Sequence, residues 1–236
     1  MLGLVFALAG CGGGESSGQV DVYAAASLAE VFPEIDTDAR FSFAGSDELA
    51  TQIREGAPAD VYAAASSKYP QELYAEGLVE EPVTFASNRL VLIVPAADPS
   101  AIESPEDLLQ DGTRLVLAAE GVPVGDYARE ALTELGLAAA LDNVVSNEDD
   151  VKGVSGKVAL GEADAGIVYA TDAVALGDDV RVVELPDSAQ PVIEYQVAVV
   201  TATERAEAAQ AFLERLLSDD GRALLESAGF VVPIPT

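Results

Sequence analysis

The stretch Asp21-Val22-Tyr23-Ala24-Ala25-Ala26-Ser27-Leu28 decides the fold, because it joins the pattern of a buried strand to that of a helix. A short apolar run ends in three alanines and a serine, and helical residues follow directly. In α/β proteins, ligands bind at the carboxyl ends of strands, where the next helix offers free backbone N–H groups. The stretch therefore predicts that Ser27 is one donor of a cleft that binds a small oxyanion.

Strand and helix patterns alternate along the rest of the chain, which predicts mostly parallel sheets with helices on their faces. Strands are expected at 20–25, 40–43, 60–66, 90–94, 114–118, 144–145, 165–169, 180–185 and 193–200. Helices are expected from about 28 and at 47–55, 68–76, 128–135, 151–160, 203–217 and 219–228, with one more start at 104–107. No linker divides the chain, so a two-lobed arrangement needs two crossings, and strands 90–94 and 193–200 are the candidates.

Residues 60–66 repeat residues 21–27 letter for letter. One repeated heptapeptide does not make a solenoid. We interpret both copies as central strands of one sheet, with alanines where helices press close. Ser66 is therefore expected to be structural, as a cap for the helix at 68–76, and not a second ligand.

The amino-acid composition excludes most kinds of catalytic site. The chain has no His and one Cys, which excludes His-based acid–base chemistry, Ser-His-Asp triads, disulfides and thiolate metal clusters. The net charge of −29 argues against nucleic acid and anionic membranes as partners. It does not exclude an anionic ligand, because exposed charges are screened beyond ~8 Å while buried N–H donors act locally.

The sequence of the amino terminus has the pattern of an export signal. Residues 2–8 form an apolar run that is too short to span a bilayer, and Leu8-Ala9-Gly10-Cys11 resembles a bacterial lipobox. A glycine- and serine-rich tether follows at 12–18. We expect cleavage before Cys11 and lipidation of its sulfur; the alternative is an uncleaved apolar terminus with a free or buried Cys.

Six short motifs resemble, in order, the periplasmic molybdate-binding proteins of ABC transporters. Each is weak alone, but six in register from Val20 to Phe230 are strong. The return strand at 193–200 resembles that family as well. The motifs are VYAAASL at 22–28, FAGS at 43–46, GAPAD at 56–60, VPVG at 122–125, EDDVKG at 148–153 and GIVY at 166–169.

The resemblance implies an α/β, two-lobed type II periplasmic-binding fold that closes over molybdate or tungstate. It also implies five ligand residues: Ser27 and Ser46 through hydroxyl and backbone N–H, Val124 and Val151 through backbone N–H, and Tyr169 through its phenol. No residue would contact the molybdenum itself. The serines and valines all fall at expected helix starts, where free N–H groups and the helix dipole favour anions.

Each of these residues has a plainer interpretation when taken alone. A serine before a helix is usually a cap, a valine packs, and a tyrosine at a strand end lines the core. Only the joint match favours binding. Lys152 is expected to be an exposed helix charge. Asp47 is compatible with an anion site only if its carboxylate faces solvent in the first helical turn, where the dipole favours it.

We therefore interpret the chain as a lipid-anchored, extracytoplasmic solute-binding protein for molybdate and tungstate. It would be a monomer without cofactor or enzymatic activity, and it would serve an ABC permease with a cytoplasmic ATPase. The alternatives are a binder of another oxyanion such as sulfate or phosphate, or a sensory or adhesive lipoprotein of the same fold. The expected boundaries are 1–19 for signal and tether, 20–88 with 197–236 for lobe I, and 89–196 for lobe II.

Overall fold

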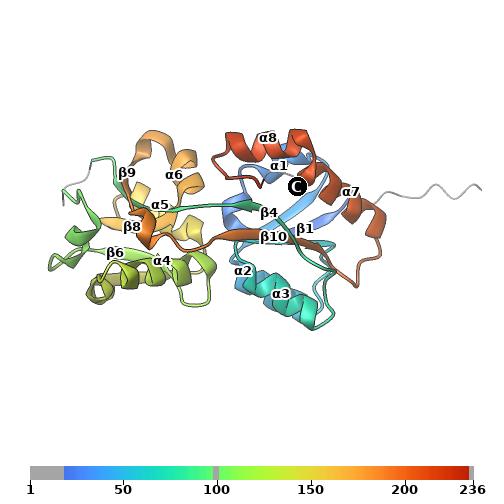
Figure 1. Ribbon diagram of the computed structural model, residues 1–236, viewed down its shortest axis with the longest axis horizontal. Coiled ribbons are helices and arrows are strands. Elements are labelled where there is room, and N and C mark those ends of the chain that lie inside the picture. The colour runs from blue at the N-terminus through green and yellow to red at the C-terminus, as the bar shows by residue number, and fades with distance from the viewer. Residues whose placement is uncertain (1–18, 98–100, 234–236) are drawn as a thin grey trace, which may run out of the picture.

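The computed structural model describes residues 19–97 and 101–233, which form two five-stranded sheets side by side (Figure 1). We call the first sheet and its helices lobe I and the second sheet and its helices lobe II. The first sheet has the order β2 (Arg40–Ala44), β1 (Asp21–Ala25), β3 (Val61–Ala64), β10 (Glu194–Val199) and β4 (Val83–Ser87). The second has the order β7 (Val144–Glu148), β6 (Leu115–Ala118), β8 (Ala165–Tyr169), β5 (Leu90–Pro95) and β9 (Val180–Glu184).

Both sheets are mixed, which refines the expectation of mostly parallel sheets. In the first, β1 runs parallel to β2 and β3, and β10 runs antiparallel to β3 and β4. In the second, β6 runs parallel to β7 and β8, and β5 runs antiparallel to β8 and β9. The antiparallel strands β5 and β10 are those next to the crossings between lobes, so their direction is set by long-range topology that local periodicity does not report.

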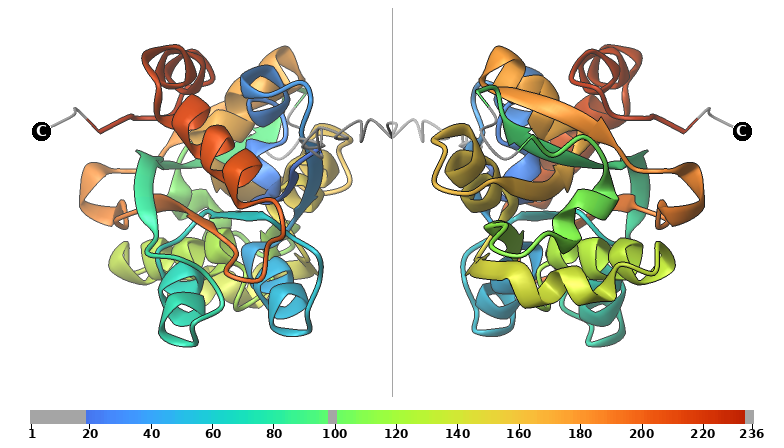
Figure 2. Two further views of the ribbon diagram at one scale, coloured as in Figure 1. Left: turned by 90° about the vertical axis from the view of Figure 1, so that its right-hand side faces the viewer. Right: turned by 90° about the vertical axis from the view of Figure 1, so that its left-hand side faces the viewer.

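Helices cover both faces of each sheet (Figures 1 and 2). On lobe I, α2 (Ser46–Arg54) and α3 (Lys68–Ala75) lie on one face, and α1 (Phe32–Ile35), α7 (Ala206–Leu217) and α8 (Asp219–Ser227) lie on the other. On lobe II, α4 (Pro123–Glu134) lies on one face, and α5 (Val151–Ala159) and α6 (Ala170–Leu176) lie on the other. Short 3-10 helices complete the chain: η1 (Ala26–Leu28), η2 (Pro105–Leu109), η3 (Ala138–Asn143), η4 (Gly177–Asp179) and η5 (Asp187–Ala189).

The two copies of the repeated heptapeptide are neighbouring strands of the first sheet, as predicted. β1 and β3 pair in parallel, with Val22 opposite Val61 and Ala24 opposite Ala63. All four of these side chains are fully buried. Small side chains on these strands let helices pack closely on both faces, so the repeat reflects burial at the centre of one sheet.

Several local elements differ from the sequence prediction. Helix α6 was not expected, and α4 begins at Pro123 and not at about residue 128. Where one helix was expected from about residue 28, the chain forms the 3-10 turn η1, which contains Ser27, followed by the separate one-turn helix α1. The strand at 144–145 extends to Glu148. The edge strand β4 was not predicted at all, because its pairing partner β10 lies more than a hundred residues away along the chain.

The chain crosses between lobes at two adjacent segments (Figure 1). The first is Asn88–Arg89, between β4 and β5. The second ends before Glu194, because β10 pairs only within the first sheet, whereas Gln190 is hydrogen-bonded to Leu90 of lobe II. The Asn88 N–H donates to the Ile193 carbonyl at 3.3 Å, so the two crossings lie side by side.

Candidate functional site

The five residues expected to bind the anion line one cavity between the lobes. Lobe I contributes residues from the carboxyl ends of β1 and β2 and from the segment after β3. Lobe II contributes the amino ends of α4 and α5 and the end of β8. The lining residues are Ala25, Ala26, Ser27, Ala44, Gly45, Ser46, Ala65, Val122, Pro123, Val124, Asp150, Val151 and Tyr169.

Ser27 lies in the η1 turn directly after β1 and is 5% exposed. Its Oγ is 2.8 Å from the hydroxyl oxygen of Tyr195, the second residue of β10. The sequence interpretation placed Tyr195 only in the return strand of the family and gave it no role. The residue pair is 168 positions apart in the chain, and no local signal could have joined them.

Ser46 is the first residue of α2, and Gly45 is its N-cap. The Ala65 backbone N–H donates to Ser46 Oγ at 3.1 Å. Because this bond occupies an acceptor position of the hydroxyl, the Ser46 proton is available for an acceptor in the cavity. The backbone N–H groups of the first helical turn have no intrahelical partner and add further donors.

Val124 and Val151 occupy the first turns of α4 and α5, and both side chains are buried. Their N–H groups belong to the first turn and are free of intrahelical bonds. Gly125 allows α4 to begin this close to β6, because a Cβ there would lie 2.3 Å from the Ala119 carbonyl oxygen. Asp150 caps α5 by accepting from the Gly153 N–H at 2.9 Å, which engages its carboxylate locally.

Tyr169 ends β8 and is 1% exposed. Its hydroxyl makes no hydrogen bond to any residue in the described part of the chain. Burial raises the pKa of Tyr169 well above its ordinary value, so the phenol keeps its proton at neutral pH. A buried donor without a partner costs about 1–3 kcal/mol. A ligand that accepts from Tyr169 removes this penalty.

One prediction about a charge near the cavity is wrong. Lys152 is not an exposed helix charge: it is 32% exposed and lies between Glu30 of lobe I at 3.5 Å and Asp172 of lobe II at 3.3 Å. Burial raises the pKa of Asp172 to about 6, so at neutral pH the ion pair with Lys152 is largely formed. Lys152 thus bridges the two lobes, and its charge is offset by two carboxylates.

Asp47 is half-buried, so the condition that its carboxylate faces solvent is met only in part. One of its carboxylate oxygens is buried and has no hydrogen-bond partner among the described residues. Burial raises the pKa of Asp47, and backbone N–H groups of the first turn of α2 oppose this shift. The side chain folds back over its own helix start, where Oδ1 is 2.7 Å from the position of a Cβ on Gly45.

Asp47→Asn is expected to strengthen binding of a dianion at neutral pH by roughly 3- to 10-fold, because it removes a like charge beside Ser46. A raised carboxyl pKa means that ionisation opposes folding. Wild type should therefore lose stability relative to the variant as pH rises from about 4 through the folded-state pKa of Asp47. Titration calorimetry and thermal unfolding between pH 4 and 8 measure both effects.

Glu48→Gln is the matched control for Asp47→Asn, because Glu48 is the next residue and is exposed. It should change neither affinity nor the pH profile. Weaker binding by Asp47→Asn would contradict the electrostatic account and indicate that the carboxylate organises the helix start.

Ser66 does not cap α3, contrary to the prediction. The helix begins at Lys68 with Ser67 at the N-cap position, and no side chain caps it. The Ser66 hydroxyl is buried and makes no hydrogen bond within the described residues. Ser66 does not line the cavity, in contrast to Ser27. The two copies of the heptapeptide therefore place their serines in different surroundings.

Residues 20–231 match the family described as bacterial extracellular solute-binding protein. The chain belongs to this family. Relatives include the molybdate-binding protein ModA of Mycobacterium tuberculosis, 36% identical over 222 residues, which cover 90% of this chain and 84% of that protein. The family membership agrees with the prediction of a solute-binding protein that is not an enzyme and acts outside the cytoplasm.

Solved structures of two binding proteins share the fold. The periplasmic molybdate-binding protein of Azotobacter vinelandii has a TM-score of 0.81 at 22% identity, covering 92% of this chain and 100% of that one. The sulfate-binding protein SubI of Mycobacterium tuberculosis has a TM-score of 0.75 at 20% identity, covering 92% and 88%. The predicted two-lobed type II fold is thereby confirmed.

Proposed function

We propose that this solute-binding protein captures molybdate, and tungstate with it, and delivers the ion to an ABC importer. The observation that carries the proposal is the buried Tyr169 hydroxyl, which lines the cavity and lacks a partner among the described residues. Two serine hydroxyls and the amino ends of α4 and α5 line the same cavity. The relatives named molybdate-binding protein ModA support the choice of ion.

The proposed ligand set is Ser27, Ser46, Val124, Val151 and Tyr169. The serines would each donate through hydroxyl and N–H, the valines through N–H and the tyrosine through its phenol. These donors carry no formal charge and suit a fully deprotonated tetrahedral dianion. Seven such bonds at about 1.5–3 kcal/mol each give roughly 10–20 kcal/mol before the losses of association. Those losses are several kcal/mol, which leaves an affinity in the micromolar range or tighter.

The proposal includes a lipid anchor at Cys11, which lies outside the described residues. The anchor would hold a monomer at the outer face of the membrane, near the permease that receives the ion. In the part of the chain that the structure describes, no helix has both the length and the apolar character needed to cross a bilayer. The protein would need no cofactor, and its acidic surface disfavours nucleic acid.

Sulfate is the second candidate, because the sulfate-binding protein SubI shares the fold. Sulfate is also a tetrahedral dianion without a proton at neutral pH, so donor chemistry alone does not separate the two ions. Ion size does separate them, because molybdate and tungstate are larger than sulfate and are close to each other in size. A cavity fitted to the larger ions would leave longer, weaker hydrogen bonds to sulfate.

Titration calorimetry of ligand-stripped protein tests the function. We expect micromolar or tighter binding of molybdate and tungstate and binding of sulfate and phosphate that is weaker by at least ~100-fold, or about 2.7 kcal/mol. Thermal unfolding should show the same order. No response to molybdate would overturn the proposal, and tighter binding of sulfate would replace it with the second candidate.

A further inference from the structure

A buried chain of polar side chains leads from the crossings between lobes to the cavity. Asn88 lies in the first crossing, and Tyr195 follows the second. Asn88 Nδ2 is 3.5 Å from the Tyr195 hydroxyl, which in turn is 2.8 Å from Ser27 Oγ. The three residues are 7%, 0% and 5% exposed. The cavity residue Ser27 is therefore bonded to groups that do not themselves line the cavity.

The Asn88 amide sets the direction of this chain. Its Oδ1 accepts from the Arg89 N–H at 2.9 Å, and its Nδ2 donates to Thr171 Oγ1 at 2.9 Å. This orientation turns Nδ2, which can only donate, toward Tyr195. The Tyr195 oxygen accepts from Asn88, which favours the arrangement in which the Tyr195 proton is donated to Ser27 Oγ. With that acceptor position filled, the Ser27 proton is left for the cavity.

We propose that Asn88 and Tyr195 are positioning residues that turn the Ser27 proton toward the bound anion and so favour oxyanions without a proton. This inference rests on the proposed function. Hydrogen phosphate carries a P–OH group that needs an acceptor, and a freely rotating serine hydroxyl can supply one. A Ser27 hydroxyl that accepts from Tyr195 and points its proton into the cavity has only one acceptor position left and is a poorer acceptor for a P–OH group, so this hydrogen-bond chain works against protonated ligands while it serves molybdate.

Tyr195→Phe removes the hydroxyl and keeps the ring. The ring contacts are edge-on to Phe85, Tyr169 and Phe230, with centroids 5.2–6.1 Å apart, and phenylalanine retains them. The variant should bind molybdate about 10-fold more weakly, the effect of one hydrogen bond to a charged group. Its affinity for phosphate, measured by displacement of bound molybdate, should stay the same or rise. The ratio of the two affinities is the readout that a merely structural role would not move.

Ser27→Ala provides the test of coupling. In a Ser27→Ala background, Tyr195→Phe should change molybdate affinity by less than about 2-fold, because the hydroxyl that it orients is gone. In a Ser66→Ala background the full effect of Tyr195→Phe should persist. Ser66 is the matched control, since it ends an identical heptapeptide and does not line the cavity.

Asn88→Asp tests the direction of the hydrogen bonds that link Asn88, Tyr195 and Ser27. The new carboxylate can only accept, so it takes the Tyr195 proton, and Tyr195 then accepts from Ser27. Molybdate affinity should fall more than in Tyr195→Phe. The loss of affinity has two parts. The part caused by the added negative charge should remain in a Ser27→Ala background, and the part caused by the changed proton direction should disappear in that background.

The outcomes separate the inference from the proposed function. If wild type does not bind molybdate, both are overturned. If wild type binds molybdate but Tyr195→Phe weakens molybdate and phosphate equally, or still weakens molybdate when Ser27 is alanine, only the inference is overturned. Thermal unfolding of each ligand-free variant verifies that it is folded before its affinities are compared.

Discussion

Gly45→Ala is expected to weaken molybdate binding by at least ~100-fold while leaving the ligand-free protein folded. Gly45 precedes α2 in lobe I, and a Cβ at this position would lie 2.6 Å from the Asp149 carbonyl oxygen of lobe II. Alanine tolerates the backbone of Gly45, with φ −58° and ψ 140°. The Cβ would also lie 2.7 Å from Oδ1 of Asp47 in lobe I, a contact that rotation of the Asp47 side chain relieves, whereas the collision with the Asp149 backbone is between the lobes.

The expected loss follows from the division of donors between the lobes. Relief of the collision requires the backbone of Asp149 to move away from Gly45, and Val151, two residues further, moves with it. Hydrogen bonds weaken steeply as they lengthen. Loss of the donors Val124, Val151 and Tyr169 at about 1 kcal/mol each amounts to roughly 3 kcal/mol, which corresponds to the expected 100-fold.

Gly156→Ala is the matched control for Gly45→Ala. Gly156 lies within α5, and a Cβ there would have nothing within 4 Å. The control should keep wild-type affinity and gain about 0.5–1 kcal/mol of stability from the better helix former. Calorimetry and thermal unfolding of both variants make the comparison. Wild-type affinity in Gly45→Ala would contradict the closed geometry as the binding state.

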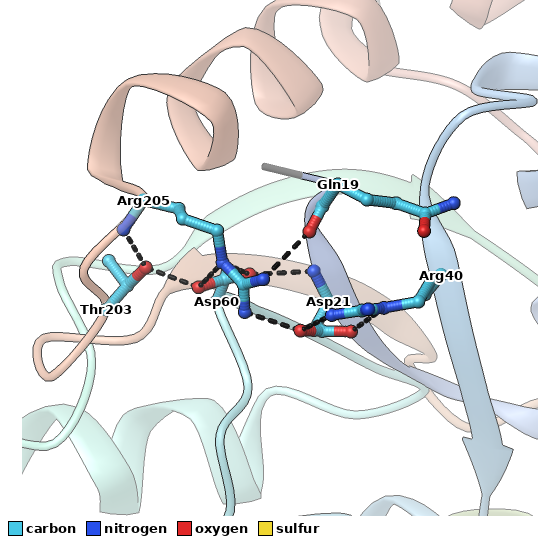
Figure 3. A network of polar contacts seen from close by, with 6 residues as sticks. All are labelled: Gln19, Asp21, Arg40, Asp60, Thr203 and Arg205. Carbon is cyan, nitrogen blue, oxygen red and sulfur yellow. Dashed lines mark hydrogen bonds and ion pairs between the residues drawn. The ribbon is translucent and has the colours of Figure 1, made fainter. Parts of the chain in front are cut away.

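Arg205→Met is expected to lower the free energy of unfolding by about 3 kcal/mol, the low end for a broken buried ion pair. Arg205 lies between Asp60 and Asp21, the first residues of the two heptapeptide copies (Figure 3). Asp60 is 3% exposed, and Arg205 Nε is 3.0 Å from its Oδ2. Removal of the guanidinium leaves two carboxylates close together, with only Arg40 as a cationic partner of Asp21 in the network of Figure 3.

The network also predicts a pH dependence. Hydrogen bonds from Arg40 and Arg205 hold the pKa of Asp21 below its usual value, against the opposing effect of burial. A lowered carboxyl pKa contributes stability that is present above about pH 4 and lost as pH falls through the folded-state pKa. The difference between wild type and Arg205→Met should therefore shrink in acid. Urea unfolding at pH 7 and pH 3 measures it.

Arg54→Met is the control for Arg205→Met. Arg54 also bridges two carboxylates, but Glu72 and Glu76 are 43% and 42% exposed, and such pairs contribute about 0–1 kcal/mol. Asp60→Asn should restore part of the stability that Arg205→Met removes, because it neutralises the buried charge. Neither Arg205→Met nor Asp60→Asn should alter molybdate affinity, since the network lies at the amino ends of β1 and β3, opposite the cavity. Equal losses from Arg205→Met and Arg54→Met would show that burial of Asp60 does not matter.

Local pattern was sufficient to predict the type and order of most elements, because strands and the helix starts that follow them are local features. The five residues of the candidate site came instead from the resemblance of six motifs to one family, and the serines and valines among them lie at helix starts, where free N–H donors arise. Local pattern failed for β4, whose partner strand is distant in the chain, and for Lys152, whose exposure depends on the opposite lobe. Exposure is a property of the packed molecule.

For Asp21–Leu28, the sequence by itself determined a buried strand that ends at a serine, and its copy at 60–66 predicts the same. Only the tertiary structure decided that the serines differ. The Ser27 hydroxyl is hydrogen-bonded to Tyr195, which lies 168 residues further along the chain, and Ser27 lines the cavity. Ser66 has neither feature. The physical reason is that a hydroxyl becomes a directed donor only through what occupies its acceptor positions. In this protein that partner comes from the strand beyond the second crossing between the lobes.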